Sequence, residues 1–152
     1  MTHIRPYRPE DRTAALALAA RLQIGVAPWR DPAAVRAAVT EWVRGSLESA
    51  GEPERTVLVA VDGDTVVGLV TVAQRRHFTG DVDAYIGELA VAEAAQRRGI
   101  GRELVRAAER WAHSRGYRRI TLDTGAANHG ARAFYAALGY AEEDVRLTRP
   151  VS

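Results

Sequence analysis

Apolar residues recur with two different periods along this chain, and the period changes from one segment to the next. Residues 56–61 and 66–73 are short runs rich in Val, and the Asp-Gly-Asp-Thr connection between them carries the glycine expected in a tight turn. These runs predict two antiparallel strands in a hairpin. A third apolar run, residues 84–91, follows a polar loop and predicts another strand of the same sheet.

Helical spacing is clearest between residues 100 and 115, where Leu104, Val105 and Ala108 fall on one face. Gly116 follows at the position where a glycine commonly ends a helix. Further helices are predicted at residues 12–22 behind an Asp11 N-cap, from an Asp31–Pro32 start to residue 49, and at residues 131–138.

The order of these elements predicts the architecture. Extended segments at residues 2–7, 118–124 and 140–148 complete the set. The helix between the strands at 84–91 and 118–124 is a crossover, so those two strands are expected to be parallel neighbours. The fold class is therefore α/β (α+β): a mixed, mostly antiparallel sheet with one parallel β-α-β crossover and helices on both faces. We expect a single domain of residues 1–152.

The composition narrows the functional classes. The chain is 47% hydrophobic and 26% charged, which is typical of a folded globular protein. It contains no Cys, which excludes disulfides and thiol catalysis, and its histidines show no ligand spacing, so no metal is expected. No signal peptide or membrane-spanning run is recognisable, and a cytoplasmic location is the expectation.

The basic residues are unusual in kind, since all 21 are Arg, although the formal net charge is only +2. Two explanations are open: a GC-rich coding sequence, or a surface that binds nucleic acid. Acidic residues are interspersed with Arg along the whole chain, and no long basic block stands out. We therefore expect neither a nucleic-acid partner nor a membrane partner.

Two glycines and several arginines stand directly in front of the helix at residues 100–115. A helix start presents unpaired backbone N–H groups and the positive end of its dipole. Glycine lets a phosphate approach those groups, and arginine adds charged donors. The pattern is neither GxGxxG nor a P-loop. The residues expected at this phosphate or pyrophosphate site are Gln96, Arg97, Arg98, Gly99, Ile100, Gly101 and Arg102.

Two motifs carry a family resemblance. LAVAEAAQRRGIGRELV resembles the acetyl-CoA-binding motif Q/R-x-x-G-x-G/A of the GNAT superfamily of N-acetyltransferases, matched at residues 96–101. NHGARAFYAALGY, residues 128–140, is similar to the later signature N-x-x-A-x-x-F-Y-x-x-x-G-F/Y. The resemblance extends over the whole chain and is most specific at residues 85–140. It implies acetyl-CoA as co-substrate and direct acetyl transfer to a primary amine of a small molecule or peptide.

The chain departs from the family at its C-terminal side. Family members usually have two strands after the last helix, whereas only about a dozen residues follow Gly139 here. The final strand is then missing, truncated or contributed by a partner chain, and a homodimer is compatible with the last alternative. This strand often helps to form the acceptor pocket, so the acceptor is less well defined than the cofactor.

The resemblance also implies site residues. Glu88 interrupts an apolar strand, and an amine with a pKa of about 10 needs a base before it can attack, so Glu88 is either that base, an acceptor ligand, or a surface carboxylate paired with Arg. Tyr135 matches the tyrosine that protonates the departing thiolate, or it is an ordinary amphipathic helix residue. Backbone groups of Leu89, Ala90 and Val91 would contact the thioester. Asn128 contacts the cofactor or caps its own helix.

The acceptor side is predicted only by analogy. It is expected between the loops at residues 24–31 and 76–83, where Trp29, Phe78 and Tyr85 are candidate lining residues together with Glu88. Asp81 and Asp83 either attract a cationic amine or are simply solvated. Two other classes of function compete: a non-catalytic acyl-CoA sensor or regulatory module, and an Arg-driven nucleic-acid binder.

Overall fold

The computed structural model describes all 152 residues, and its sheet has five strands in the order β1-β2-β3-β4-β5. The predicted hairpin and crossover are both confirmed, because β2 runs antiparallel to β3 and β4 runs parallel to β5. A two-residue loop with Gly63 at φ +61° joins β2 to β3. The strands are β1 (Thr2–Pro6), β2 (Arg55–Asp62), β3 (Thr65–Arg76), β4 (Val82–Val91) and β5 (Ile120–Leu122).

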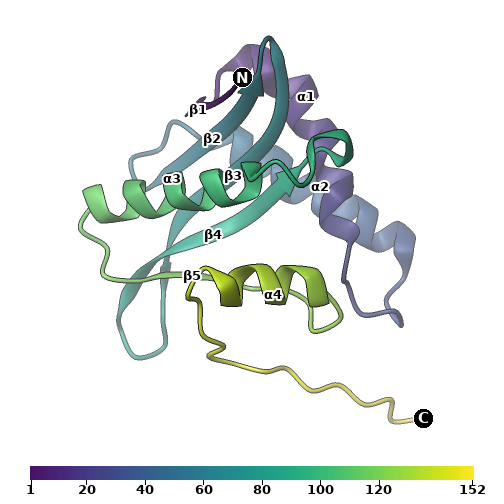
Figure 1. Cartoon of the computed structure of the whole chain (residues 1–152). Helices are drawn as coiled ribbons and strands as arrows, with labels where there is room; N and C mark the ends of the chain where they lie inside the picture. Colours follow the sequence, from purple (N-terminus) through teal and green to yellow (C-terminus); the bar gives the residue numbers. More distant parts are fainter.

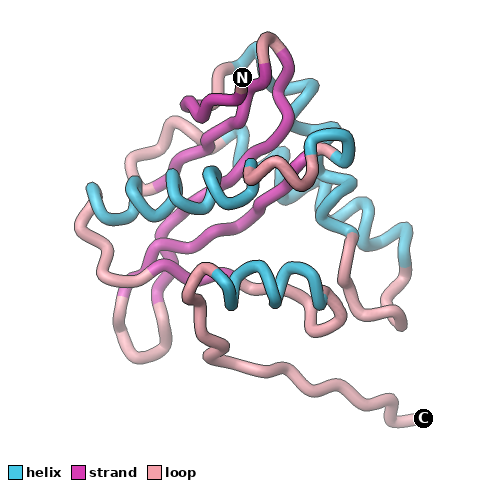
Figure 2. The backbone as a smooth tube through the Cα atoms, in the orientation of Figure 1, coloured by secondary structure: helices cyan, strands magenta, loops and turns pink.

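Helices cover both faces of this sheet, as predicted (Figure 1). One face carries α3 and α4, which pack on Val70, Val72 and Ile86. The other face carries α1 and α2. Figure 2 shows the two helical layers with the strands between them. The helices are α1 (Arg12–Ala17), α2 (Pro32–Glu48), α3 (Ile100–Ser114) and α4 (His129–Ala137), with 3-10 turns η1 (Pro9–Asp11), η2 (Leu18–Gln23) and η3 (Glu93–Ala95). No helix is long and apolar enough to span a bilayer.

Local signals placed the ends of the longer helices well. The Asp31 carboxylate accepts a hydrogen bond from the Ala34 N–H at 2.9 Å, and Pro32 opens α2. Gly116 has φ +83° just after α3, a conformation that costs glycine little. Leu104, Val105 and Ala108 are fully buried, as the helical period predicted.

The first predicted helix is wrong in two respects. It does not run from 12 to 22, because the α-helix ends at Ala17 and tighter 3-10 turns continue to Gln23. Asp11 does not cap it: the Asp11 carboxylate instead accepts from the Arg5 guanidinium at 2.7 and 2.9 Å and from the Arg8 N–H at 2.9 Å. An Arg on a neighbouring strand thus competes with the helix start for this side chain.

The C-terminal extended segments are also shorter in structure than in prediction. The strand expected at 118–124 is reduced to Ile120–Leu122, because only three residue pairs join it to β4. Residues 140–148 are extended but pair with no strand, and the tail runs away from the sheet (Figure 1). The ion pair between Arg132 and Glu142, at 2.7 Å, and the contact of His77 Nε2 with the Glu143 carboxylate, at 3.1 Å, hold its beginning.

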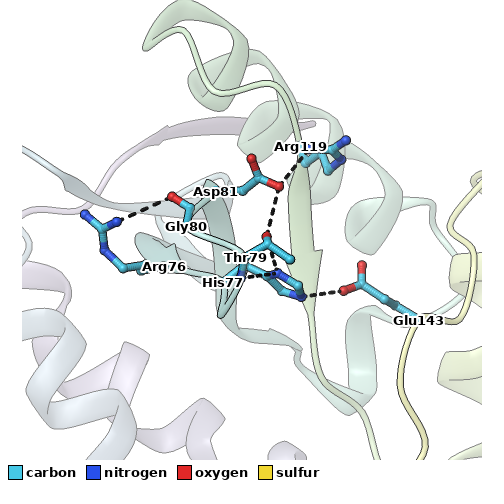
Figure 3. Close-up of polar contacts among 7 residues, drawn as sticks. All are labelled: Arg76, His77, Thr79, Gly80, Asp81, Arg119 and Glu143. Atoms are coloured by element: carbon cyan, nitrogen blue, oxygen red, sulfur yellow. Dashed lines mark hydrogen bonds and ion pairs between the residues drawn. The ribbon is translucent and has the colours of Figure 1, made fainter.

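The tip of the β3–β4 hairpin is held by its own polar contacts (Figure 3). The His77 N–H donates to the Asp81 carbonyl at 2.8 Å, and the Asp81 carboxylate accepts from the Thr79 hydroxyl at 3.2 Å. Arg119 lies 3.7 Å from the same carboxylate. Asp83, expected to be solvated if it did not bind an amine, is instead buried. The hairpin is therefore an ordered element that links β3, β4, β5 and the tail.

Candidate active site

The parallel strands β4 and β5 are paired at one end only. Pairing covers Ala84 to Ile86 of β4, whereas β4 continues to Val91 without a partner strand on that side. The Ala92 N–H donates to the Val67 carbonyl of β3 at 2.8 Å. Because successive N–H groups of a strand point to alternate sides, those of Leu89 and Val91 face the open edge.

The open edge is partly covered by one side chain. Arg21 of η2 donates from Nε to the Val91 carbonyl at 3.2 Å. The rest of the edge, from Gly87 to Leu89, receives no partner strand. An extended ligand with amide groups can therefore add to β4 as a further strand would.

The predicted phosphate loop precedes α3 as an open helix start. Gly99 is the N-cap residue with φ +76°, no side chain caps the helix there, and a Cβ at Gly99 would meet nothing within 4 Å. A Cβ at Gly101 would contact Phe134 at 3.5 Å and Val91 at 3.8 Å. The free N–H groups of the first turn are thus accessible and lie beside the open end of β4 and the face of α4.

The arginines of this loop are not equivalent. The Arg98 guanidinium donates to the Asp62 carboxylate at 2.9 Å and to the Thr2 hydroxyl at 3.2 Å, so it is engaged with the ends of β1 and β2. Arg97 has a left-handed backbone, with φ +63°, and it forms no ion pair, nor does Arg102. Two of the three predicted cationic donors therefore remain free for an anion.

Glu88 is buried, with 6% of its surface exposed, on the face of β4 that α2 covers. Ser46 donates to Oε1 at 2.7 Å, and Thr71 donates to Oε2 at 2.7 Å. Burial raises the pKa of Glu88, while the two hydroxyl donors and the charge of Arg55 act in the opposite direction. Glu88 forms no ion pair, so it is not the Arg-paired surface carboxylate considered above.

A cavity of about 140 Å³ opens onto this carboxylate. Tyr85 lines it, and the Tyr85 hydroxyl donates to Asp123 at 3.0 Å while the Arg75 guanidinium lies 4.5 Å from the ring centroid. Burial raises the pKa of Tyr85 to about 12. The remaining lining residues are Ser46, Ser49, Arg55, Thr56, Val57, Thr71, Val72, Ala73 and Gly87.

Tyr135 lies on the opposite side of the sheet, in the core formed with α3. It is 9% exposed and packs edge-on against Phe134 and Tyr140, with ring centroids 5.0 and 5.4 Å apart. Burial raises its pKa to about 12. No protein group hydrogen-bonds its hydroxyl, and the hydroxyl is not sealed from solvent. Tyr135 thus has a neutral O–H that lacks a protein partner.

Asn128 caps its own helix, which is one of the two roles expected from the sequence. Its side chain accepts from the Ala131 N–H at 3.1 Å, which caps α4, and donates to the Ile24 carbonyl at 3.3 Å. Gly25 and Gly125 meet at the same place, because a Cβ on either would overlap the other loop. The loop after β5 is therefore packed directly on the loop before α2.

The predicted acceptor residues are only partly brought together. Tyr85 and Glu88 line the same cavity. Trp29 is 63% exposed in the loop before α2, and Phe78 is 90% exposed at the tip of the β3–β4 hairpin. These two loops lie at opposite ends of β4 (Figure 1), so Trp29 and Phe78 do not line one site.

Sequence reasoning missed Ser46 and Thr71. Ser46 lies three residues after Val43 and just before Leu47, both buried, so a hydroxyl interrupts the apolar stripe of α2. Thr71 likewise interrupts the buried run of β3. Polar residues at core positions of two separate elements are the signal that could have found them. The structure contains no group of three or more His, Asp or Glu side chains placed to hold a metal.

Comparison with known proteins shows which family this chain resembles. The model of the Acetyltransferase (GNAT) family matches residues 17–140. An aminoglycoside N(6')-acetyltransferase type 1 of Klebsiella aerogenes is 32% identical over 90 residues, which are 57% of this chain and 58% of that protein. The chain thus matches little more than half the length of this curated relative.

Solved structures share the whole fold. A protein of Pyrococcus furiosus has a TM-score of 0.78 at 24% identity, covering 99% of this chain and 100% of its own. A GCN5-related N-acetyltransferase of Ralstonia eutropha JMP134 has a TM-score of 0.76 at 20% identity, with 99% of both chains covered. An aminoglycoside N-acetyltransferase in complex with CoA has a TM-score of 0.72 at 19% identity, covering 99% and 95%. The family model covers most of the sequence and includes both motifs, so the chain belongs to the Acetyltransferase (GNAT) family of acyltransferase enzymes.

Proposed function

We propose that this protein transfers the acetyl group of acetyl-CoA directly to a primary amine of a small molecule or peptide. The observation that carries the proposal is the unpaired end of β4, which lies beside the uncapped start of α3 and whose strand carries the buried Glu88 carboxylate. Acetyl-CoA supplies an activated thioester when bound.

The co-substrate fits the open helix start and the open strand edge. The N–H groups of the first turn of α3, together with Arg97 and Arg102, would bind its pyrophosphate. The N–H groups of Leu89 and Val91 would bind the amides of its pantetheine arm and polarise the thioester carbonyl. Gln96 and Ile100 belong to the segment at the start of α3, and Ala90 belongs to the open end of β4. Asn128 would act here through its cap of α4, which holds Tyr135 in place.

Glu88 would accept the proton of the incoming ammonium, directly or through a water in the cavity. Its raised pKa suits this role, because a base works best when its pKa lies close to the working pH. Tyr135 would donate a proton to the departing thiolate from the other side of β4. Both reacting partners would be held together, so positioning supplies much of the rate.

The acceptor class is supported by the relatives. The Klebsiella aerogenes relative is an aminoglycoside N(6')-acetyltransferase, and the CoA complex is also of an aminoglycoside N-acetyltransferase. Amino sugars are therefore the first amines to screen, followed by polyamines, amino acids and peptide N-termini. The cavity beside Glu88, with Tyr85 and Asp123 at its edge, is the proposed amine site.

The test is release of CoA thiol from acetyl-CoA in the presence of this panel of amines. The Glu88→Gln variant should lower kcat/KM by on the order of 10²-fold or more, the usual loss on removing a general base. Glu48→Gln, an exposed carboxylate of α2, is the matched control and should leave kcat/KM unchanged. Binding of acetyl-CoA without turnover of any amine would support the sensor alternative.

A further inference from the structure

We infer that Ser46 is a positioning residue whose hydroxyl orients the Glu88 carboxylate toward the amine cavity. The inference rests on the proposed role of Glu88 as base. Ser46 lies on α2 and Glu88 on β4, 42 residues apart in sequence, and Ser46 Oγ lies 2.7 Å from Glu88 Oε1. Neither the family motifs nor the strand pattern contains Ser46.

The hydrogen bonds around Glu88 determine which hydroxyl donates to which carboxylate oxygen. The Glu88 N–H donates to Thr71 Oγ1 at 2.9 Å, so that oxygen is already an acceptor. The one hydroxyl proton of Thr71 then goes to Glu88 Oε2 at 2.7 Å. Oε1 receives its donor from Ser46 alone. Each carboxylate oxygen is thus fixed by one hydroxyl, and the two hydroxyls come from elements on different sides of the side chain.

The position of Thr71 adds to this constraint. Thr71 is opposite Glu88 in the β3–β4 register, and the register shifts between Thr71 and Val72. The bulge leaves Gly87 without a partner residue, and a Cβ at Gly87 would lie 3.1 Å from the Thr71 hydroxyl. Thr71 therefore anchors Glu88 to its own sheet, while Ser46 decides how the carboxylate is turned toward α2.

The electrostatic surroundings of Glu88 are simple. The charged and titratable groups that line the cavity with it are Arg55 from β2 and Tyr85 from β4, and α2 and β3 contribute only hydroxyls. Arg55 forms its ion pair with Glu52 at 3.2 Å, not with Glu88. Tyr85, with a pKa of about 12, stays neutral below pH 9. Glu88 is then the only carboxylate that lines the cavity.

A hydroxyl that donates to a carboxylate stabilises the charged form, so its loss raises the pKa of the acid. Hydrogen bonds to charged groups are strong enough to move a pKa by about one unit or more. Removing Ser46 Oγ should therefore move the acid limb of the pH–rate profile upward. A purely structural role in packing α2 would instead lower activity or stability equally at all pH values.

The chain offers a matched control. Ser49, the C-cap residue of α2, lines the same cavity, but its hydroxyl donates to the Gly45 carbonyl at 2.9 Å and does not contact Glu88. Ser46→Ala and Ser49→Ala delete the same atom three residues apart. Ser46→Thr keeps a hydroxyl at the critical position and serves as the conservative rescue.

The first experiment is the pH dependence of kcat/KM between pH 5.5 and 9, with one amine used for all variants. Ser46→Ala should shift the acid limb upward by about one pH unit, while Ser49→Ala and Ser46→Thr keep the wild-type profile. An unshifted limb in Ser46→Ala, or an equal shift in Ser49→Ala, would overturn the inference.

The second experiment needs no substrate, so it separates this inference from the proposed function. The ¹³C NMR titration of the Glu88 side-chain carboxyl, assigned with Glu88→Gln, reports its pKa in the free protein. Ser46→Ala should raise that pKa by about one unit, and an unchanged value would contradict the inference even in an inactive protein. Full activity of Glu88→Gln would contradict the proposed function instead, whatever the titration shows.

Discussion

In the proposed mechanism, one physical cause would serve two opposite proton transfers, at Glu88 and at Tyr135. Burial raises the pKa of both side chains. A general base accepts a proton most effectively when its pKa lies near the working pH, and the raised pKa of Glu88 brings it closer to that pH. An acid must keep its proton, and Tyr135, at about 12, remains protonated throughout an ordinary assay range.

Removing the Tyr135 hydroxyl tests its side of this scheme. Tyr135→Phe should lower kcat by on the order of 10²-fold with little change in the KM for acetyl-CoA. Because no protein group hydrogen-bonds this hydroxyl, the free energy of unfolding should change by less than about 1 kcal/mol. Steady-state kinetics and thermal unfolding of the same preparation provide both readouts. Undiminished kcat would rule out Tyr135 as the acid.

At the scale of elements, the first strand is joined to the first helical turns by one ion pair. The Arg5 guanidinium of β1 contacts both oxygens of Asp11, which is 6% exposed. The hydrogen bond from Arg5 lowers the pKa of Asp11 below its ordinary value. The stabilisation is therefore fully present above the pKa of an unfolded Asp, about 4, and is lost as the pH falls through the lower pKa of the folded state.

Asp11→Asn should lower the free energy of unfolding by about 2–3 kcal/mol at pH 7, since it leaves the Arg5 charge without its partner. The difference from wild type should narrow as the pH falls below about 4. Urea unfolding at several pH values measures both effects. The exposed Arg12–Glu48 pair, at 3.8 Å, is the control: Glu48→Gln should cost less than about 0.5 kcal/mol.

The loop before α2 contacts the loop after β5, and glycine is required where the two loops touch. Gly25 has φ +81°, and a Cβ there would overlap Asn128, whereas Gly63, at φ +61°, has open space around it. Gly63→Ala should therefore cost only the backbone strain, about 1–2 kcal/mol. Gly25→Ala should cost a further 1–3 kcal/mol, roughly the penalty of overpacking, in thermal or urea unfolding. Equal losses would mean that the loops separate without cost.

At the scale of the whole molecule, the proposed co-substrate would join α3, α4 and β4. Acetyl-CoA at about 100 times its Kd should stabilise the protein by about 2.7 kcal/mol, which corresponds to a rise in Tm of roughly 5–10 °C. Gly99→Asp should abolish this rise, because it adds a carboxylate at the open helix start. Gly116→Asp, at the other end of α3, with φ +83° and open space around it, should retain it. Differential scanning fluorimetry measures each shift against the variant's own ligand-free Tm.

The type and order of the elements as far as α4, and the glycine-led start of α3, followed from the sequence. These features depend on local causes: apolar periodicity, the caps at Asp31 and Gly116, and glycines before a helix. The family resemblance added the proposed roles of Glu88 and Tyr135, of which only Tyr135 lies within a quoted motif. Local signals also have limits, as the early end of α1 at Ala17 and the unpaired segment at residues 140–148 demonstrate.

Only the tertiary structure decided which side chains meet. It paired Arg98 with Asp62, gave Asp11 to Arg5 rather than to a helix cap, and brought Ser46 and Thr71 to Glu88. It also separated the two loops that carry Trp29 and Phe78. The sequence by itself determined the type of most segments, because helix and strand preferences are set by near neighbours. The contact of Ser46 with Glu88 was decided by the packing of α2 on the sheet, which joins residues 42 positions apart.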